Sequence, residues 1–332
     1  MHSLTSLHTF GLSSSGNQVI SIDSFDMLQK QFMNVTTDPF CILGGGSNTV
    51  FLDDYQGTIF KMALKGIQIE ESDSEYLVTA AAGENWHQLV EYCMQQGING
   101  LENLALIPGT VGAAPIQNIG AYGVEVERFI RRVDYFDLHA HSVKSLGREH
   151  CQFDYRDSIF KSQLAGQFII TQVVLALPKS WIAVTQYGEL QHLTAPTPMD
   201  IFNKVVALRK SKLPDPIKIG NAGSFFKNPI INKKLFTELQ QEWPEIPNYP
   251  IDASNVKVPA AWLIDRLGFK GKKNGGIGCH PNQALVLFND GTGTGEQLLQ
   301  FARSIKSAVS HTFSINLENE VRLMDSQGLV TL

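Results

Sequence analysis

Two glycine-rich segments constrain this chain more than any other feature of its sequence. The first, Gly44-Gly45-Gly46-Ser47-Asn48, follows residues 39–43, an apolar run that we predict to be a buried strand. The second covers residues 107–123 and is rich in glycine, alanine and proline. Because glycine has no Cβ, its backbone can approach a flat or anionic neighbour closely. Two such loops in one chain favour a large ligand over a pair of ordinary turns.

Neither loop has the spacing of a common nucleotide-binding motif. Thr49 stands where the dinucleotide fingerprint Gly-x-Gly-x-x-Gly needs its third glycine. The chain also lacks the Gly-Lys-Ser/Thr of a P-loop. Taken alone, each loop is compatible with a phosphate cradle and with a connection that packs only on itself.

The composition is that of an ordinary globular protein without affinity for nucleic acid. The 332 residues predict two or three domains, and a net charge of -5 without a basic stripe argues against a nucleic-acid partner. We expect no membrane span and no signal peptide, because no apolar run is long enough and the amino terminus has no basic start. The cysteines have neither metal-ligand nor redox spacing, so we expect no metal site, free thiols and a cytoplasmic location: Cys41, Cys93, Cys151 and Cys279.

Apolar patterns predict alternating strands and helices. Strands are expected at residues 59–64, 76–82, 132–138, 168–177 and 284–288. Asn85 can cap a helix that Gly97 ends, and further helices are expected at 198–210, 260–267 and 295–310. A linker at residues 213–216 suggests a domain boundary. The alternation of apolar and charged residues predicts a final strand over residues 313–324.

A single serine, Ser224, lies between a glycine-rich run and two aromatic residues, in Gly220-Asn221-Ala222-Gly223-Ser224-Phe225-Phe226. The nucleophile elbow of a hydrolase has the pattern Gly-x-Ser-x-Gly, and the second glycine is missing here. Ser224 by itself is therefore compatible with a turn residue, and only the rest of the chain can argue for a catalytic role.

Six segments together resemble the UDP-N-acetylenolpyruvoylglucosamine reductase family, flavoenzymes of bacterial cell-wall synthesis. They occur in the family's order and span nearly the whole chain, so the resemblance is specific. These segments are residues 44–48, 107–112, 117–123, 155–161, 220–229 and 317–322. Tyr187, in Gln186-Tyr187-Gly188-Glu189, looks like the tyrosine of a loop insertion that one type within this family carries.

The resemblance implies an α+β fold whose flavin-binding part, of the vanillyl-alcohol oxidase type, consists of two α+β subdomains. Residues 1–66 would form the first FAD-binding subdomain, completed by a C-terminal strand within residues 313–332. Residues 67–212 would form the second subdomain. Residues 213–312 would form an α+β substrate-binding domain.

The resemblance also implies noncovalent FAD, NADPH as co-substrate, and reduction of UDP-N-acetylglucosamine enolpyruvate to UDP-N-acetylmuramate, a peptidoglycan precursor, by a monomer. The residues implied to bind FAD are Gly44, Gly45, Gly46, Ser47, Asn48, Pro108, Gly109, Thr110, Gly112, Ala113, Asn118, Gly120, Ala121, Tyr122 and Gly123. The residues implied to bind the substrate are Tyr155, Tyr187, Lys212, Asn228 and Tyr249, with Arg209 a weaker candidate.

Three residues are implied to carry the catalysis: Arg156, Ser224 and Glu320. Arg156 offers a rigid charged fork to the substrate carboxylate. Ser224 would give a proton to the carbon beside that carboxylate, after a hydride has reached the neighbouring carbon. Glu320 would either be held near Arg156 or carry a proton and hydrogen-bond an enolate-like oxygen, and both protonation states remain open.

The chain departs from the family at two places. Asn319 stands where the family usually has proline, which should be harmless in a strand, and Ala113 and Ala114 replace the hydroxyl residues of many members.

Two alternative functions remain: a flavin-dependent oxidase of the same fold and a nucleotide-sugar-binding protein without catalysis. The intact catalytic residues argue against the binding protein. In addition, no histidine or cysteine in the glycine loops stands out as a flavin tether, which argues against the oxidase.

Overall fold

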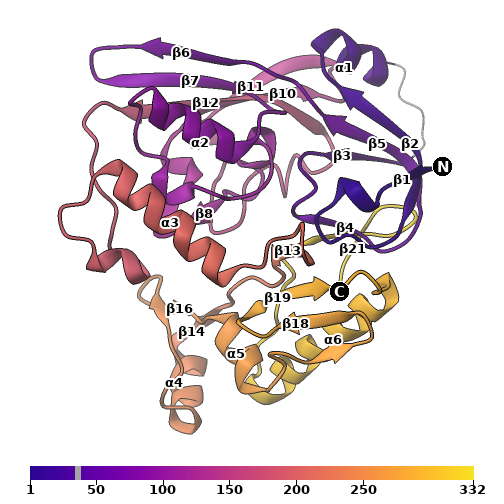
Figure 1. Ribbon diagram of the computed structural model, residues 1–332, viewed down its shortest axis with the longest axis vertical. Coiled ribbons are helices and arrows are strands. Elements are labelled where there is room, and N and C mark those ends of the chain that lie inside the picture. The colour runs from indigo at the N-terminus through magenta and orange to yellow at the C-terminus, as the bar shows by residue number, and fades with distance from the viewer. Residues whose placement is uncertain (34–38) are drawn as a thin grey trace. The chain divides into compact units, whose positions relative to one another are not determined.

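A computed structural model describes residues 1–33 and 39–332, and the chain divides into two compact units (Figure 1). The central unit contains residues 18–45 and 58–211. The terminal unit contains both chain ends, in residues 1–17, 46–57 and 212–332. Two divisions between them fall inside strands β2 (Ser15–Ile22) and β5 (Tyr55–Met62).

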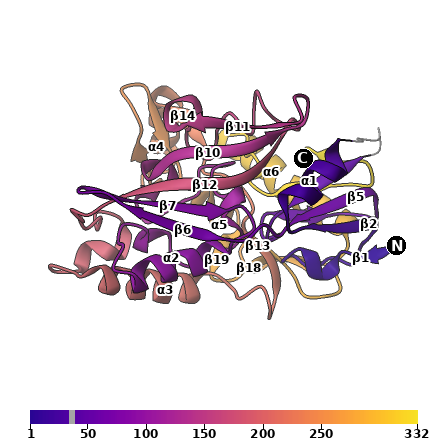
Figure 2. The same cartoon turned by 90° about the horizontal axis from the view of Figure 1, so that it is seen from above.

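The central unit is built around a five-stranded antiparallel sheet. Its order is β11 (Ser142–Gly147), β10 (Ile130–Asp137), β12 (Phe168–Pro178), β7 (Glu75–Ala81) and β6 (Ile67–Glu71). Helices α2 (Trp86–Gln95) and α3 (Pro198–Lys212) lie side by side on one side of this sheet (Figure 2). As predicted, the Asn85 side chain caps α2 by accepting from the Gln88 amide, and Gly97 follows the helix with a left-handed φ of 74°.

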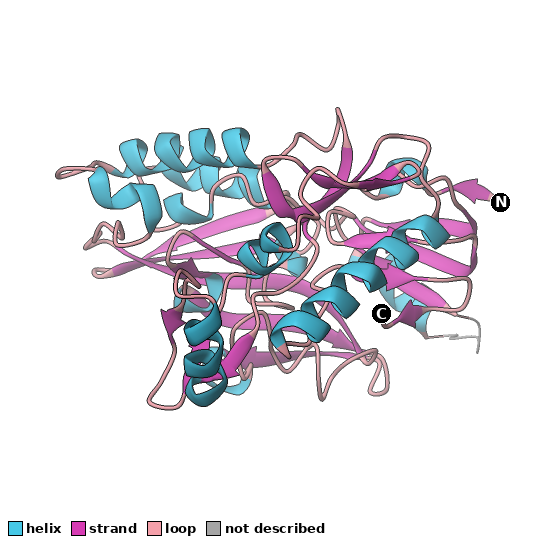
Figure 3. Cartoon of the chain, turned by 90° about the horizontal axis from the view of Figure 1, so that it is seen from below, coloured by secondary structure: helices cyan, strands magenta, loops and turns pink. Residues whose placement is uncertain are grey.

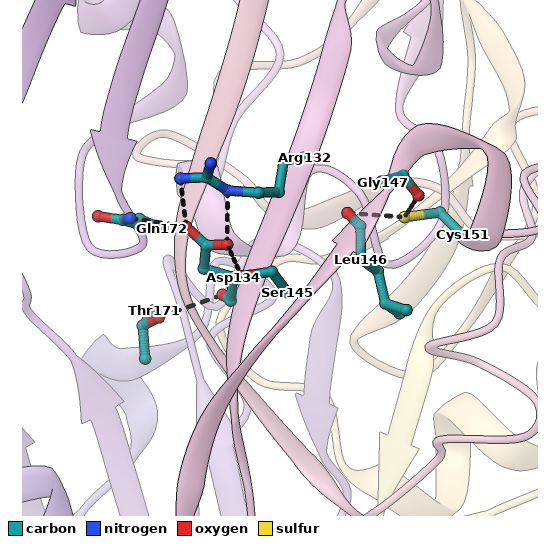
Figure 4. Close-up of polar contacts among 8 residues, drawn as sticks. All are labelled: Arg132, Asp134, Ser145, Leu146, Gly147, Cys151, Thr171 and Gln172. Carbon is teal, nitrogen blue, oxygen red and sulfur yellow. Dashed lines mark hydrogen bonds and ion pairs between the residues drawn. The ribbon is translucent and has the colours of Figure 1, made fainter.

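One buried carboxylate fixes the register of this sheet. Arg132, Ser145 and Gln172 each donate to Asp134, so that side chains from β10, β11 and β12 converge on one acceptor (Figure 4). Burial alone would raise the pKa of Asp134. These hydrogen bonds outweigh it and hold the pKa below its ordinary value. These hydrogen bonds join three neighbouring strands of the sheet.

Several shorter elements complete the central unit. Strand β3 (Phe40–Leu43) pairs in parallel with β5, and its end leads into Gly44. Helix α1 (Phe25–Phe32) begins at Ser24, whose side chain accepts from the Met27 amide. Strands β8 (Gly120–Ala121) and β9 (Val124–Glu125) form a hairpin.

The terminal unit contains a four-stranded sheet covered by two helices. The sheet order is β13 (Gly220–Ser224), β19 (Gln283–Asn289), β18 (Ile277–His280) and β17 (Lys273–Asn274). Helices α5 (Ala260–Arg266) and α6 (Gly295–Phe313) pack on it (Figure 3). Helix α6 begins with a capping box formed by Thr294 and Gln297, which satisfies two amides that the helix itself cannot.

Three smaller groups of strands complete this unit. Strands β14 (Ile230–Asn232), β16 (Asn255–Lys257) and β15 (Tyr249–Pro250) form a sheet beside α4 (Lys233–Glu242). Strand β4 (Thr49–Phe51) pairs in parallel with β20 (Arg322–Met324), which also pairs with β21 (Leu329–Val330). Strand β1 (His2–Ser3) pairs with the start of β2.

The predicted continuous strand at the carboxyl end is wrong. Helix α6 extends to Phe313, and Ser314 ends it with a left-handed φ of 55°. The following residues form one isolated bridge, between Asn319 and Phe226, and ladder pairing begins only at Arg322, in the short strand β20. The alternation was a correct guide to burial: Ile315, Leu317, Val321 and Leu323 are all buried. An apolar-polar alternation reports one buried side, and it does not require a neighbouring strand.

The other predicted strands and helices are present, with ends that differ by a few residues. The loop at residues 181–198 also contains a 3-10 turn, Gly188–His192. Within residues 1–33 and 39–332, no helix has the length and apolarity to cross a membrane. The same residues contain no group of three or more His, Cys, Asp or Glu that could hold a metal ion.

Candidate active site

The first glycine loop and the start of the second pack backbone against backbone in the central unit. A Cβ added to Gly45 would lie 2.9 Å from the Gly109 Cα, and one added to Gly44 would lie 2.5 Å from the Thr110 hydroxyl. The Gly109 carbonyl accepts from the Trp86 amide at 3.1 Å, which ties the same loop to the beginning of α2. These glycines are therefore needed first for loop packing, before any ligand is considered.

The third glycine of the run, Gly46, is required for a different reason, a close contact inside the terminal unit. Gly46 has a φ of 67°, and a Cβ there would lie 1.9 Å from the Leu7 carbonyl oxygen. Its own carbonyl accepts from the Thr9 amide at 3.1 Å. Ser47 follows in the same loop and is partly exposed.

The segment from Gly120 to Gly123 is a tight β-hairpin. Ala121 pairs with Val124, which leaves Tyr122 and Gly123 as a two-residue turn. Both have positive φ, 49° and 82°, as a type I′ turn requires. Glycine suits the second turn position, whereas tyrosine at the first is strained. Strained backbone of this kind is typical of ligand-binding loops.

The Asn118 side chain anchors this hairpin. Both its amide nitrogen and its amide oxygen form hydrogen bonds within the protein. Asn118 is completely buried, with a φ of 45°. Its Nδ2 donates to Glu125 at 3.0 Å and to the Asp154 carbonyl at 3.2 Å, while its Oδ1 accepts from the Glu127 amide at 3.1 Å. Asn118 therefore joins the hairpin to the segment that carries Arg156.

Arg156 lies against the same hairpin, in a left-handed conformation with φ 54°. Its Nη2 donates to the Gly120 carbonyl at 2.9 Å, and its guanidinium lies 5.4 Å from the centre of the Tyr155 ring. A Cβ on Gly120 would lie 3.1 Å from the Arg156 Nη1, so glycine at position 120 gives the guanidinium room. The carboxylates of Asp154 and Asp157 accept the amides of Tyr155 and Ser158.

Tyr187 lies over the turn of the hairpin. Its ring meets the Tyr122 ring edge to face at 6.3 Å, and its side chain is 44% exposed. A Cβ on Gly123 would be 3.3 Å from the Tyr187 Cβ. The structure thus brings together, inside the central unit, a tyrosine predicted to bind substrate and a loop predicted to bind FAD.

Two buried residues that the sequence reasoning did not single out hold these loops together. Asn103 donates to the carbonyls of Tyr122 at 2.9 Å and Val184 at 2.8 Å. Its neighbour Glu102 accepts the Gly100 amide and a hydrogen bond from the Trp181 side chain. Burial raises the pKa of Glu102. The Tyr187 segment is therefore anchored on the 3-10 turn Glu102–Leu104.

A β-bulge sets the direction of Ser224 in the terminal unit. Asn221 pairs with Phe288 and Ser224 with Val286, so β13 contains one more residue than β19 over this interval. Gly223 has a φ of 71°, and its amide donates to the Asn221 Oδ1 at 3.1 Å. Bulges commonly re-aim a side chain beside an active site. Among the described residues, the Ser224 hydroxyl makes no hydrogen bond, unlike a serine that stabilises a turn.

The Glu320 main chain bonds to the residue that follows Ser224, inside the terminal unit. The Glu320 amide donates to the Phe225 carbonyl at 2.8 Å, and the Lys227 amide donates to the Glu318 carbonyl at 2.9 Å. The Glu320 carbonyl accepts from the Asn48 side chain at 3.2 Å. The amide of Asn319 is not used in this pairing. Proline, which has no amide hydrogen, would therefore break no hydrogen bond of this pairing.

The remaining predicted substrate residues have mixed surroundings. Asn228 Oδ1 accepts the Ala260 amide at 2.9 Å and thereby caps α5. Lys212 is exposed at the end of α3, and Tyr249 is 44% exposed in β15. Arg209 directs its Nε to the Leu106 carbonyl at 3.1 Å. Ala113 is partly buried and Ala114 is fully buried.

Comparison with known proteins now identifies the family. A model described as "FAD binding domain" matches residues 30–139, and one described as "UDP-N-acetylenolpyruvoylglucosamine reductase, C-terminal domain" matches residues 215–324. The UDP-N-acetylenolpyruvoylglucosamine reductase of Pseudoalteromonas atlantica is 56% identical over 332 residues, which is 100% of this chain and 96% of that protein. The chain belongs to the UDP-N-acetylenolpyruvoylglucosamine reductase family. The family resemblance found in the sequence is confirmed.

Other members of the reductase family agree with this assignment. The enzyme of Pseudoalteromonas translucida is 50% identical, over 98% of this chain and 96% of its own length. The crystal structure of the reductase from Thermus caldophilus superimposes with a TM-score of 0.66 at 22% identity, covering 96% of each chain. That likeness and the matched FAD domain confirm the expected α+β flavin-binding fold.

The glycine loops of this reductase-family member have the character of a flavin site. Positive φ values are concentrated there, at Leu106, Gly109, Asn118, Tyr122 and Gly123. Glycine and left-handed backbone allow a diphosphate or a flat ring to approach the main chain closely. The residues present therefore fit FAD.

Proposed function

We propose that this protein catalyses the NADPH-dependent reduction of UDP-N-acetylglucosamine enolpyruvate to UDP-N-acetylmuramate. FAD, when bound noncovalently, would accept a hydride from NADPH and pass it to the enolpyruvyl double bond. The observation that carries the proposal is the position of Ser224. Ser224 ends a β-bulge in β13, and the Glu320 main chain bonds to Phe225, the residue that follows Ser224, which supports a shared role for the two residues.

Three sets of residues would hold the flavin. Residues 44–48 and Pro108, Gly109, Thr110, Gly112 and Ala113 would contact the diphosphate mainly through their backbone, since two alanines replace hydroxyl side chains. The hairpin residues Gly120, Ala121, Tyr122 and Gly123 would lie along the ring system. Asn118 would act through its backbone, because its side chain is already engaged.

Arg156 would bind the substrate carboxylate. Its guanidinium is oriented by the Gly120 carbonyl and the Tyr155 ring, so little side-chain entropy remains to be lost on binding. Its positive charge would stabilise the negative charge that develops on the carboxylate as the neighbouring carbon gains electrons.

Ser224 would donate its proton to the carbon beside the carboxylate. A hydroxyl is a weak acid, but a carbanion is a strong base, so the transfer runs downhill without a partner base. Within the described residues, the Ser224 hydroxyl has no hydrogen-bond partner, so its proton would be available for transfer. Glu320, held by its backbone, would hydrogen-bond the same developing enolate or orient the serine.

The nucleotide part of the substrate would be bound by Tyr155, Tyr187, Lys212, Asn228 and Tyr249, with Arg209 in a supporting role. Because NADPH is also a diphosphate nucleotide, we propose that it uses much of the same surface in turn. We further propose a monomeric enzyme of the cytoplasm, where its four buried cysteine thiols would stay reduced. Residues 1–66 and 67–212 would form the two flavin subdomains and residues 213–312 the substrate domain.

Absorption spectroscopy of the purified protein tests this function. The protein should be yellow, with about one FAD per chain, and anaerobic NADPH should bleach it. Addition of the enolpyruvyl substrate should then restore the flavin colour, and steady-state kinetics should be ping-pong. A protein that binds the UDP-sugar but is not reoxidised by it would be the non-catalytic alternative. One that is reoxidised only by dioxygen would be the oxidase.

A further inference from the structure

A strained residue stands directly before the second glycine loop. Leu106 has a φ of 58°, a left-handed conformation that leucine rarely adopts. Strain of this kind persists only where the surrounding structure holds it in place. Both peptide groups next to the Leu106 Cα are in fact held by side chains, one from α2 and one from α3.

His87 of α2 holds the first peptide group. Its Nδ1 accepts the Leu106 amide at 3.1 Å, and its ring stacks on Phe202 of α3 at 5.8 Å with an interplanar angle of 15°. The Nε2 lies 3.5 Å from a carboxylate oxygen of Glu91. An accepting Nδ1 carries no proton, so the neutral ring has its proton on Nε2, facing Glu91. One tautomer satisfies both neighbours.

Arg209 of α3 holds the second peptide group. Its Nε donates to the Leu106 carbonyl at 3.1 Å. Helices α2 and α3 lie side by side (Figure 1), and the stacked His87 and Phe202 rings join them at this point. The beginning of the loop is thus clamped between the two helices, and Arg209 has a role beyond the substrate contact predicted for it.

The position of Leu106 is transmitted directly to both glycine loops. Three residues further on, Gly109 accepts the Trp86 amide and packs on the Gly45 backbone. Thr110 occupies the space beside Gly44. A change in the backbone at Leu106 would move Gly109 and Thr110 away from these contacts, because two closely packed glycine backbones leave no space for small shifts.

We propose that His87, together with Arg209, is a positioning residue that holds the Leu106–Gly112 loop in its FAD-binding conformation, and that it does so only while its Nδ1 is unprotonated. This inference rests on the proposed assignment of that loop to the flavin. His87 touches neither cofactor nor substrate in this account. It acts through the loop backbone.

The charges around His87 favour the required neutral form. Burial lowers its pKa, Glu91 opposes this, and the cations Lys210 and Arg209 on α3 lower it further, so that the net pKa is below 6.5. Above pH 6.5 the ring is neutral and accepts the Leu106 amide. As the pH falls through the lowered pKa, a proton on Nδ1 would face the amide proton of Leu106, and the grip on the loop would be lost.

Two substitutions separate the hydrogen bond from the ring. His87→Phe keeps a ring to stack on Phe202 but removes the acceptor. His87→Asn places an amide oxygen near the position of Nδ1 and cannot titrate. The apoprotein of each is titrated with FAD at a series of pH values from 7.5 down to the lowest pH at which it stays folded, with quenching of flavin fluorescence as the signal. His150→Asn, at an exposed histidine of the same unit, is the control.

The parent should lose FAD affinity as the pH falls from 7.5 through the lowered pKa of His87. His87→Phe should bind FAD roughly tenfold more weakly at pH 7.5, the value of one buried hydrogen bond. His87→Asn should recover most of the affinity at pH 7.5 and lose the pH dependence. In the parent labelled with ¹⁵N-histidine, the Nδ1 resonance of His87 should be that of an unprotonated nitrogen at pH 7.5.

Equal FAD affinity in His87→Phe and the parent would overturn the proposal, as would a protonated Nδ1 at pH 7.5. Gly45→Val separates this failure from failure of the loop assignment. If Gly45→Val releases FAD while His87→Phe retains it, the loop binds flavin but His87 does not position it. If both retain FAD fully, the loop is not the flavin site. If His87→Phe does not fold, the pH profiles of the parent and His87→Asn decide, and identical profiles contradict the proposal.

Discussion

Glu320 is bound through its backbone amide to the carbonyl of Phe225, the residue that follows Ser224, at 2.8 Å. The Glu320 carbonyl is held in turn by the Asn48 side chain. The position of the Glu320 main chain therefore does not depend on its own carboxyl group. A substitution that changes only the carboxyl group tests its chemistry without moving the chain.

Glu320→Gln should fold normally and retain FAD, because the backbone hydrogen bonds remain. Reoxidation of the NADPH-reduced flavin by the enolpyruvyl substrate should slow by about 10²-fold, the cost of losing one group that stabilises the transition state. Stopped-flow flavin absorbance measures both half-reactions. Glu318→Gln is the matched control, since that exposed carboxylate pairs with Lys227 at 2.9 Å and contributes at most about 1 kcal/mol. Parental reoxidation in Glu320→Gln would limit Glu320 to a backbone role.

Asn221→Ala should disturb the bulge that orients Ser224. The Asn221 side chain accepts the Gly223 amide and donates to the carbonyls of Pro214 and Ile219. Losing these buried hydrogen bonds should cost about 1–3 kcal/mol of the free energy of unfolding. It should also slow substrate reduction more than flavin reduction by NADPH. Urea unfolding and rapid mixing test this, with Asn316→Ala at an exposed site as control. A variant as stable and as fast as the parent would show that Gly223 alone maintains the bulge.

Asn103→Ala should detach the Tyr187 segment from the FAD-loop hairpin. Both hydrogen bonds of its amide group join carbonyls of these two segments, so their loss should raise the KM for the UDP-sugar about tenfold. It should also lower the melting temperature. The control is Asn99→Ala, which removes only a local bond to the Gly97 carbonyl on an exposed turn. An unchanged KM despite lower stability would indicate that Tyr187 is placed independently of Asn103.

Buried His8 should make the protein sensitive to mild acid. Burial lowers its pKa from 6.5 to about 4, against a smaller opposing effect of the hydrogen bond to the Leu12 carbonyl. The unfolded chain takes up this proton near pH 6.5 and the folded chain only near pH 4. Stability from this group is therefore complete above pH 6.5 and falls as the pH drops toward 4. The total loss is about 3 kcal/mol.

His8→Gln removes this titration and should flatten the dependence of stability on pH between 6.5 and 4. Urea midpoints of parent and variant at pH 7.5 and pH 4.5 measure the difference. Because other groups titrate equally in both proteins, only the contribution of His8 separates the two curves. Parallel curves would mean that His8 is protonated in the folded state without cost.

The sequence predicted well wherever one local pattern determines structure. The Asn85 cap, the Gly97 stop and the strand before Gly44 follow from residue type and spacing, and each is present. The C-terminal residues show the limit of such patterns. Their alternation identified the buried side of the segment, but the register of a strand depends on a partner that the pattern does not name.

The sequence did not predict why particular positions require glycine. Gly45 was predicted to make room for a ligand, and the structure shows that it makes room for Gly109. Asn103, Asn221 and His87 were missed because a polar side chain that bonds distant backbone carries no periodic signal. Only the family resemblance connected Ser224 to Glu320 across nearly a hundred residues.

Ser224→Ala tests the central claim most directly. Pre-reduced variant is mixed rapidly with the enolpyruvyl substrate under anaerobic conditions, and the return of flavin absorbance is followed. We predict that NADPH reduces the variant at nearly the parental rate, that reoxidation slows by at least about 10²-fold, and that Ser224→Cys recovers part of the loss. Reoxidation of Ser224→Ala at the parental rate would contradict the account and assign Ser224 to the bulge alone.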